Sequence, residues 1–127
     1  MKIAYLDTHV ALYLHAGQVS KLSKAAEREI ERSELRMSPM ALLELEYLYE
    51  RKRTRWSAER IVDDLRESLG VQLCTIPFAA SSRAAVKLGW TSDPFDRLIV
   101  GNAIAAGHAP LITQDETIRS NYRAATW

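Results

Sequence analysis

Short runs of β-forming apolar residues alternate with helical segments along this chain, and this alternation limits the possible folds most strongly. The first predicted strand covers residues 3–6, and a helix follows over residues 8–15. The later predicted strands cover residues 35–37, 71–76, 111–113 and 123–126. Helices are predicted over residues 21–32, 39–52, 57–70, 79–88 and 94–107, with a short one after Asp115. Because alternating strands and helices form parallel sheets with helices on both faces, the pattern predicts an α/β fold with four to five strands.

Residues typical of helix ends support these boundaries. Ser38 followed by Pro39 indicates a helix start, since Ser accepts a hydrogen bond from the first turn and Pro fits the first helical position. Either Ser20 or Ser23 could cap the helix that ends near residue 32. We therefore expect the helices to begin and end close to the ranges given above.

Length and composition indicate what kind of protein this is. The 127 residues predict a single domain, 1–127, with its own core. The one cysteine, Cys74, excludes an internal disulfide and predicts a cytoplasmic protein. No segment is long enough to cross a membrane, and Asp7 and His9 interrupt the apolar start that a signal peptide would need. The formal net charge is only +1, so any attraction to nucleic acid must be local.

Four acidic residues occupy the ends of predicted strands or the first turns of predicted helices. They are Asp7, Glu44, Asp96 and Asp115. In a parallel α/β sheet the carboxyl ends of the strands meet at one crevice, where ligands bind. Carboxylates gathered there repel one another, and a hard divalent cation removes that cost. The spacing therefore favours a Mg²⁺ or Mn²⁺ site of the kind used in phosphate-ester chemistry.

Each acid also has an ordinary structural explanation. Asp7, Asp96 and Asp115 are all at positions where an aspartate stabilises a helix start. Glu44 is a good helix former, but it stands between Leu43 and Leu45, near the buried edge of its helix. A carboxylate beside apolar residues needs a partner, and one metal site would supply that partner to all four acids.

Four segments of the chain carry recognisable motifs. They cover residues 6–9, 38–44, 90–100 and 111–115, and the run at 93–97 (Asp-Pro-Phe-Asp-Arg) is the most specific. In their order and spacing these segments resemble the PIN-domain family, and within it the VapC-type ribonuclease toxins of bacterial toxin–antitoxin pairs. The resemblance spans nearly the whole chain and implies a three-layer α/β/α domain. It also implies a metal-dependent endoribonuclease that hydrolyses RNA phosphodiesters with a metal-activated water.

The resemblance also implies roles for particular residues. Asp7, Glu44, Asp96 and Asp115 correspond to the acidic quartet that holds Mg²⁺ or Mn²⁺, and Glu44 would help to deprotonate the water. Asp93 would be an accessory acid, and hydroxyl groups would orient carboxylates or water. Those hydroxyls belong to Thr8, Ser38 and Thr113. Thr91 and Ser92 stand where many relatives have His or Arg, which leaves substrate contacts there open.

Basic residues offer a weaker signal for RNA binding. The run at Arg51, Lys52, Arg53 and Arg55, next to Trp56, could bind phosphates and bases, or it could be a solvated helix end. Arg97 could stabilise phosphate charge or pair with a neighbouring acid. The resemblance further implies a homodimer and a small antitoxin partner.

Two other functions remain as alternatives. A phosphoryl-transfer domain is also parallel α/β with clustered aspartates. A receiver domain, however, needs an Asp that ends the third strand and a Lys late in the chain. A haloacid-dehalogenase phosphatase needs a second Asp two residues after Asp7. This chain has neither pattern. The second alternative is a non-catalytic binding module with the PIN fold. The intact acids argue against it, but only a nuclease assay excludes it.

Overall fold

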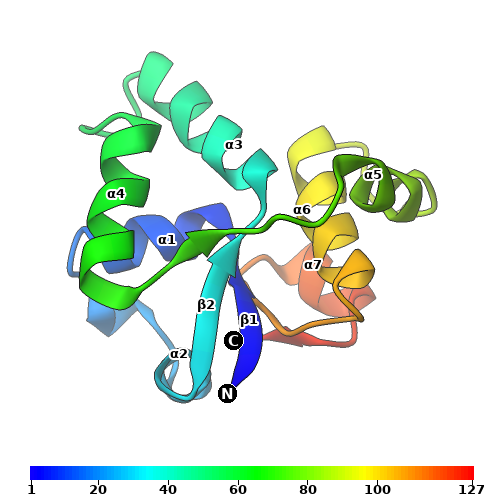
Figure 1. The fold of residues 1–127 in the computed structure, drawn as a ribbon, viewed down its shortest axis with the longest axis horizontal. Helices are drawn as coiled ribbons and strands as arrows, with labels where there is room; N and C mark the ends of the chain where they lie inside the picture. The colour runs from blue at the N-terminus through cyan, green and yellow to red at the C-terminus, as the bar shows by residue number, and fades with distance from the viewer.

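Five parallel strands form one sheet in the computed structural model, which describes all residues 1–127. The strands are β1 (Lys2–Leu6), β2 (Ser33–Met37), β3 (Gln72–Leu73), β4 (Leu111–Ile112) and β5 (Ala125–Thr126). They lie in the order β3-β2-β1-β4-β5, with β1 at the centre (Figure 1). Every neighbouring pair is parallel, which confirms the predicted sheet.

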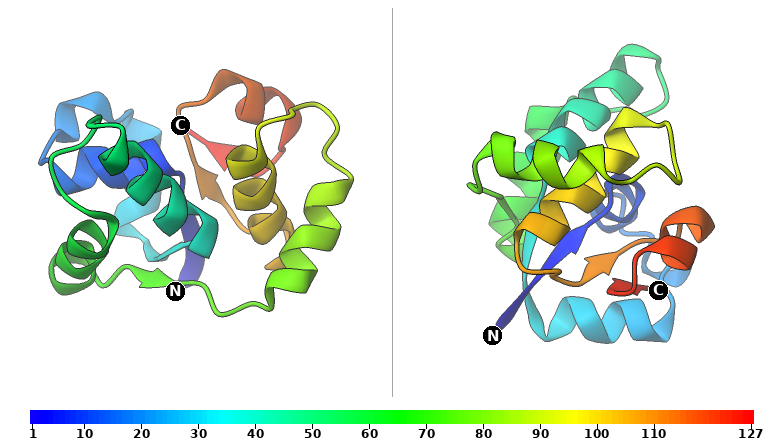
Figure 2. Two further views of the ribbon diagram at one scale, coloured as in Figure 1. Left: turned by 90° about the horizontal axis from the view of Figure 1, so that it is seen from above. Right: turned by 90° about the vertical axis from the view of Figure 1, so that its right-hand side faces the viewer.

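Seven α-helices cover the two faces of this sheet. They are α1 (Thr8–His15), α2 (Lys24–Glu31), α3 (Pro39–Glu50), α4 (Ala58–Leu69), α5 (Phe78–Val86), α6 (Pro94–Ala105) and α7 (Glu116–Asn121). The first four gather on one side and the last three on the other, as the view from above shows (Figure 2). This division follows from right-handed crossovers, because the chain moves outward from β1 to β3 and then returns to β4 and β5. The predicted three-layer α/β/α architecture is therefore confirmed.

The elements differ from the sequence predictions mainly at the sheet edge. Only Gln72–Leu73 pairs with β2, although residues 71–76 were expected to form a strand. After Cys74, whose N–H still donates to the Met37 carbonyl at 2.8 Å, the chain leaves the sheet towards α5. A short 3-10 turn over Val19–Lys21 was not predicted, and Ser23, not Ser20, caps α2 by accepting from the Ala26 N–H at 3.0 Å.

The apolar faces of strands and helices meet in a cluster of 24 buried hydrophobic residues. Gly101 lets α5 and α6 pack closely, because a Cβ at this position would meet the Ser81 carbonyl oxygen at 2.6 Å. None of the helices is long and apolar enough to cross a membrane.

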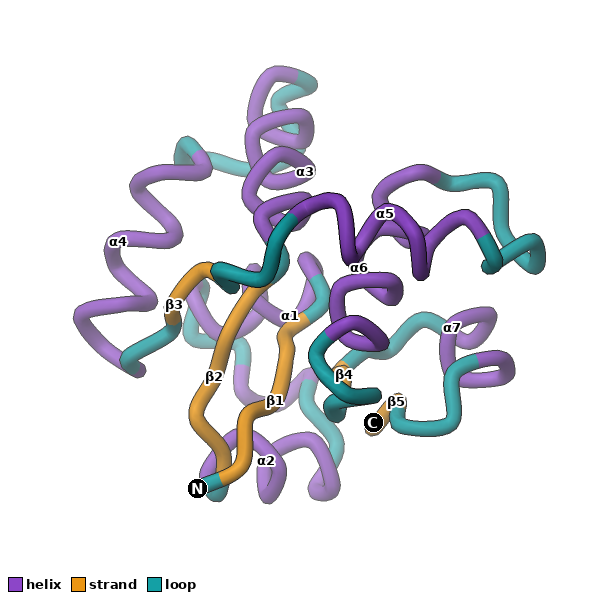
Figure 3. Tube along the Cα trace, turned by 45° about the vertical axis from the view of Figure 1, so that its right-hand side comes forward, coloured by secondary structure: helices purple, strands orange, loops and turns teal.

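The strand order reverses beside β1, and this is where a crevice forms in a parallel sheet. The chain leaves β1 towards β2 on one side, whereas β4 lies on the other side of β1. At the carboxyl ends of β1 and β4, the loops that follow these strands therefore lead away in opposite directions. In the tube view α1 leaves the top of β1, and α3 and α6 lie near the same end of the sheet (Figure 3). The side chains after β1 and β4 are thus placed at the mouth of this crevice.

Candidate active site

Asp7 lies at the carboxyl end of β1, next to Thr113 at the end of β4. Leu6 and Ile112 are register partners, so the residues that follow them stand side by side. The Thr113 hydroxyl donates to Asp7 Oδ2 at 2.6 Å, and the Thr8 N–H donates to Asp7 Oδ1 at 2.8 Å. Asp7 is only 7% exposed. The sheet register therefore fixes this carboxylate firmly at the crevice.

Glu44 reaches the same crevice from α3. The buried residues of α3 are Ala41, Leu45 and Leu48, and Glu44 lies beside this stripe. Its Oε1 atom accepts a hydrogen bond from the Thr8 hydroxyl at 2.5 Å. Thr8 thus links the two carboxylates, since its N–H contacts Asp7 and its hydroxyl contacts Glu44.

The first turn of α6 contributes two more acids. Asp93 caps the helix, with its Oδ1 accepting from the N–H groups of Phe95 and Asp96 at 2.8 and 3.2 Å. Asp96 is half-buried one turn before Ile99 and Val100, which are buried in the core. The core packing of α6 therefore holds the Asp96 carboxylate at the crevice.

Asp115 and Ser38 both act as helix caps, but only Asp115 lies at the crevice. Asp115 Oδ1 accepts from the Ile118 N–H at 2.8 Å, and its own N–H donates to the Thr113 hydroxyl at 3.1 Å. The Ser38 hydroxyl accepts from the Met40 N–H at 3.1 Å and does not line the cavity described next. In this structure the Ser38 hydroxyl therefore contacts the first turn of α3, and its predicted accessory role stays a prediction.

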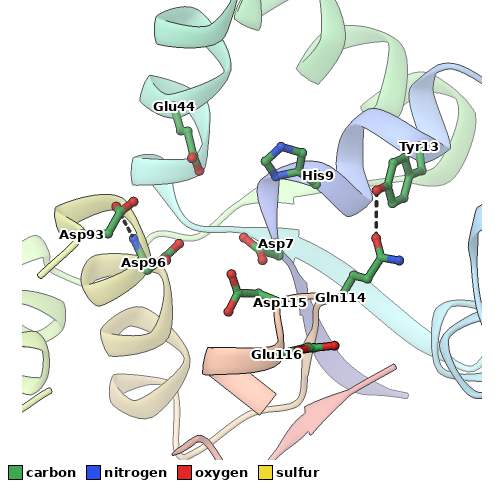
Figure 4. Close-up of a pocket in the computed structure, with 9 residues that line it drawn as sticks. All are labelled: Asp7, His9, Tyr13, Glu44, Asp93, Asp96, Gln114, Asp115 and Glu116. Atoms are coloured by element: carbon green, nitrogen blue, oxygen red, sulfur yellow. Dashed lines mark hydrogen bonds between the residues drawn. The ribbon is translucent and has the colours of Figure 1, made fainter. Parts of the chain in front are cut away.

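One cavity of about 540 Å³ contains the carboxylates of Asp7, Glu44, Asp96 and Asp115, together with Asp93 (Figure 4). The sequence analysis missed four further lining residues. They are His9, Tyr13, Gln114 and Glu116. The Tyr13 hydroxyl donates to Gln114 Oε1 at 2.8 Å across the cavity edge. His9 and Tyr13 are four residues apart on α1, so helical spacing after Asp7 was a signal for both.

The cavity is strongly acidic, and His9 is the one basic side chain among its lining residues. Six carboxylates line it, no Lys or Arg does, and none of the six forms a salt bridge. Burial, followed by the charges of Asp93, Asp7, Asp115 and Glu44, raises the pKa of Asp96 from 3.8 to about 7. Burial also raises the pKa of Asp7 and of Glu44, against the opposing effects of their hydrogen bonds and of the nearby His9. The acids are therefore close enough to destabilise one another's charged forms.

This set of donors suits a hard divalent cation. Carboxylate oxygens are the ligands that Mg²⁺ prefers, and a cation would lower the repulsion that raises these pKa values. No three acidic, histidine or cysteine side chains stand together as a ready-made ligand group. The side chains that could hold such a cation are therefore Asp7, Glu44, Asp96 and Asp115, each of which lines the cavity separately.

The structure separates the basic residues that the sequence grouped as RNA-binding candidates. Arg97 does not point into the acidic cavity or pair with an acid: its guanidinium donates to the carbonyls of Ala85 and Val86 at 3.2 and 3.0 Å. It therefore fastens α6 to the end of α5. The run at residues 51–55 lies in the exposed turn between α3 and α4.

Comparison with known proteins identifies relatives over nearly the whole chain. The PIN domain family model matches residues 4–124. Ribonuclease VapC22 of Mycobacterium tuberculosis is 32% identical over 124 residues, which cover 95% of this chain and 93% of that protein.

Solved structures share the fold at lower sequence identity. VapBC2 from Rickettsia felis, bound to a promoter DNA fragment, superposes with a TM-score of 0.65 at 20% identity, covering 93% of this chain and 92% of that one. DNA-bound VapBC from Salmonella typhimurium gives a TM-score of 0.58 at 18% identity, covering 98% and 96%. VapBC-1 from nontypeable Haemophilus influenzae gives 0.55 at 22% identity, covering 93% of each chain. These likenesses establish the fold.

Proposed function

Because this chain belongs to the PIN-domain family, we propose that residues 1–127 form a single nuclease domain that cleaves RNA as the toxin of a toxin–antitoxin pair. The observation that carries the proposal is the cavity at the ends of β1 and β4, which six carboxylates line without any Lys or Arg. The name of the 32% identical relative, a ribonuclease, supports RNA as the substrate.

The proposed cofactor is Mg²⁺ or Mn²⁺. PIN-domain ribonucleases generally depend on divalent metal ions. Asp7, Asp96 and Asp115 would hold the ion, and Glu44 would complete the site. When bound, the cation would supply a Lewis acid that activates water and neutralises charge on the phosphate.

The remaining roles follow from hydrogen bonds of the protein itself. Thr113 and Thr8 hold Asp7 in one orientation, and Asp93 fixes the first turn of α6 on which Asp96 stands. Glu44 uses Oε1 to accept from Thr8, which leaves Oε2 free to take a proton from the attacking water.

The proposed partners are a small antitoxin protein and a second copy of the chain, in the cytoplasm. The three solved relatives are VapBC structures, which supports an antitoxin partner. Phe78 and Val86 on α5 are 57% and 75% exposed, and such apolar residues are typical of a subunit interface. Light scattering of the purified chain would test the homodimer, and co-expression with an adjacent small gene should relieve growth inhibition.

The decisive experiment is cleavage of an RNA pool by the purified protein. We expect cleavage with Mg²⁺ or Mn²⁺, none with EDTA, and a rate about a hundredfold or more lower for folded Asp7→Asn. Full activity in EDTA, or in folded Asp7→Asn, would refute the mechanism. No cleavage of any RNA under these conditions would favour the non-catalytic binding module.

A further inference from the structure

A second cavity lies beside the acidic one, between α1 and the turn that joins α3 to α4. It measures about 400 Å³. Its walls are formed from α1, from residues 53–56 of the turn, and from Ile61 of α4. Tyr13 lines both cavities, so the two are neighbours along the face of α1. The two cavities therefore lie next to each other, with Tyr13 between them.

The second cavity has the opposite charge to the first. Arg53 and Arg55 line it, both are exposed, and neither forms a salt bridge. No carboxylate is among the lining residues. The nearby acid Asp64 is already bound by His15 at 2.8 Å and Arg60 at 3.1 Å. The two guanidinium groups are therefore available to an anion from solution.

Hydrogen bonds of the turn decide which of the basic residues reach this cavity. The Arg53 N–H donates to the Leu48 carbonyl at 2.8 Å, while Lys52 has a left-handed backbone with φ of 60°. Arg51 instead stacks on Tyr47, with its guanidinium 4.4 Å from the ring centre. Neither Arg51 nor Lys52 lines the cavity. The basic run is thus divided into a pair that faces the cavity and a pair that does not.

Trp56 adds an aromatic surface to the two arginines. It is 45% exposed and lines the cavity with Leu12 and Ile61, while the Arg60 guanidinium lies 4.8 Å from its ring centre. The Thr54 hydroxyl donates to the Trp56 carbonyl at 3.1 Å, which stabilises this part of the turn. An aromatic ring beside free cations is the combination that holds single-stranded nucleic acid, because bases stack on the ring and phosphates bind the cations.

We propose that this cavity is a nucleotide-binding subsite for the RNA strand that flanks the scissile phosphate. Arg53 and Arg55 bind phosphates, and Trp56 with its apolar neighbours receives a base. The inference rests on the proposed function, since it takes the acidic cavity as the place of cleavage. Electrostatics also support the proposal. The six carboxylates repel phosphates and the net charge of the chain is only +1, so an RNA strand needs a separate group of cations to bind it.

The test compares two matched double variants that remove the same charge from the same turn. Arg53→Gln/Arg55→Gln removes the pair that lines the cavity, and Arg51→Gln/Lys52→Gln removes the pair that does not. Binding of a fluorescent single-stranded RNA of about ten nucleotides is measured by anisotropy in EDTA, so that cleavage does not interfere. The first variant and Trp56→Ala should each raise Kd about tenfold, and the control by less than about threefold. The first variant should also lower the salt dependence of log Kd by about 1.4, as expected for two lost phosphate contacts.

Cleavage supplies a second readout. With Mn²⁺, Arg53→Gln/Arg55→Gln should raise KM for the long RNA and leave kcat within about twofold, because a uniform binding interaction is lost. Equal effects of the two double variants on Kd would overturn the subsite. It would also be overturned if Arg53→Gln/Arg55→Gln bound RNA as the wild type does but no longer co-purified with an antitoxin, because the cavity would then be a protein-binding site. If the wild type cleaves nothing but the variants differ in Kd as expected, the proposed function fails and the binding site stands.

Discussion

Two buried or half-buried carboxylates at opposite ends of the sheet have opposite surroundings. Glu29, on α2 near the amino ends of β1 and β2, is only 3% exposed. Its carboxylate contacts Arg32 Nη2 at 3.2 Å, Lys2 Nζ at 3.3 Å and the Ser33 hydroxyl at 2.8 Å. These partners lower its pKa from 4.5 to about 2, whereas Asp96 in the acidic cavity has a pKa raised to about 7.

The contrast shows that the chain can neutralise a buried acid with its own cations. It contains 17 Lys and Arg against 16 Asp and Glu, so cations are not scarce. At the amino end of the sheet Lys2 and Arg32 pair with the carboxylate of Glu29, as expected because a buried charge is stable only when it is paired. At the carboxyl end six carboxylates are left without any Lys or Arg. The lack of positive charge is therefore specific to the acidic cavity. A cation from solution can supply this charge.

The largest expected difference between the two regions is in catalysis. Asp96→Asn should lower the rate of RNA cleavage by about a hundredfold or more, because a group that stabilises the transition state is lost. Glu29→Gln, a matched change at the other end of the sheet, should stay within about twofold of wild type. Single-turnover cleavage of one RNA by the three proteins measures both. Equal losses in the two variants would mean that Asp96 acts only through the fold.

The next expected difference between the two regions is in how much a metal ion stabilises the protein. A cation that binds only the folded protein adds about 2.7 kcal/mol at a hundredfold excess over Kd. Melting temperatures with Mn²⁺ and with EDTA should therefore differ for wild type and for Glu29→Gln. Asp96→Asn should lose most of the increase. A full increase in Asp96→Asn would show that Mn²⁺ binds elsewhere.

Without metal, Glu29→Gln and not Asp96→Asn should be the variant with the lower free energy of unfolding. Glu29→Gln should cost about 1–3 kcal/mol, because it leaves hydrogen-bond donors without a charged acceptor. Asp96→Asn should be as stable as wild type or more so, since one repelling charge is removed. Urea unfolding in EDTA measures both values. A loss of about 1 kcal/mol in Asp96→Asn would instead indicate a helix-start role.

The last expected difference between the two regions is in the pH dependence of stability. The folded pKa of Asp96 is raised, so its protonated form favours the folded state, and stability without metal should fall as pH rises from about 4 to about 7. The folded pKa of Glu29 is lowered, so its contribution is present above pH 4.5 and is lost as pH falls towards 2. Unfolding curves at several pH values should show a smaller decline between pH 4 and 7 in Asp96→Asn. An unchanged slope would contradict the raised pKa.

Local patterns explain why much of the fold was predictable. Helix ends at Ser38–Pro39, Ser57 and Gly70 were visible because capping depends on neighbouring residues; Gly70 has a left-handed φ of 70°. The convergence of Asp7, Glu44, Asp96 and Asp115 on one cavity followed from parallel topology together with the family resemblance.

Features that depend on distant contacts were not predictable. The role of Arg97 is set by the carbonyls at the end of α5, eleven and twelve residues earlier in the chain. The early end of β3 depends on where the chain must turn to reach the other face of the sheet. The ion pair between Lys2 and Glu29 also joins residues with no common motif. Each requires knowledge of three-dimensional packing.

The close contact at Gly101 has a mechanical consequence for the acidic cavity. With no side chain at Gly101 to separate them, and with Arg97 fastened to the Ala85 and Val86 carbonyls, α5 and α6 form a stiff two-helix arm. Asp96 is five residues from Gly101, about 7.5 Å along the helix axis. The position of Asp96 relative to Asp7 therefore depends on how α5 packs as well as on how α6 packs, although no residue of α5 lines the acidic cavity.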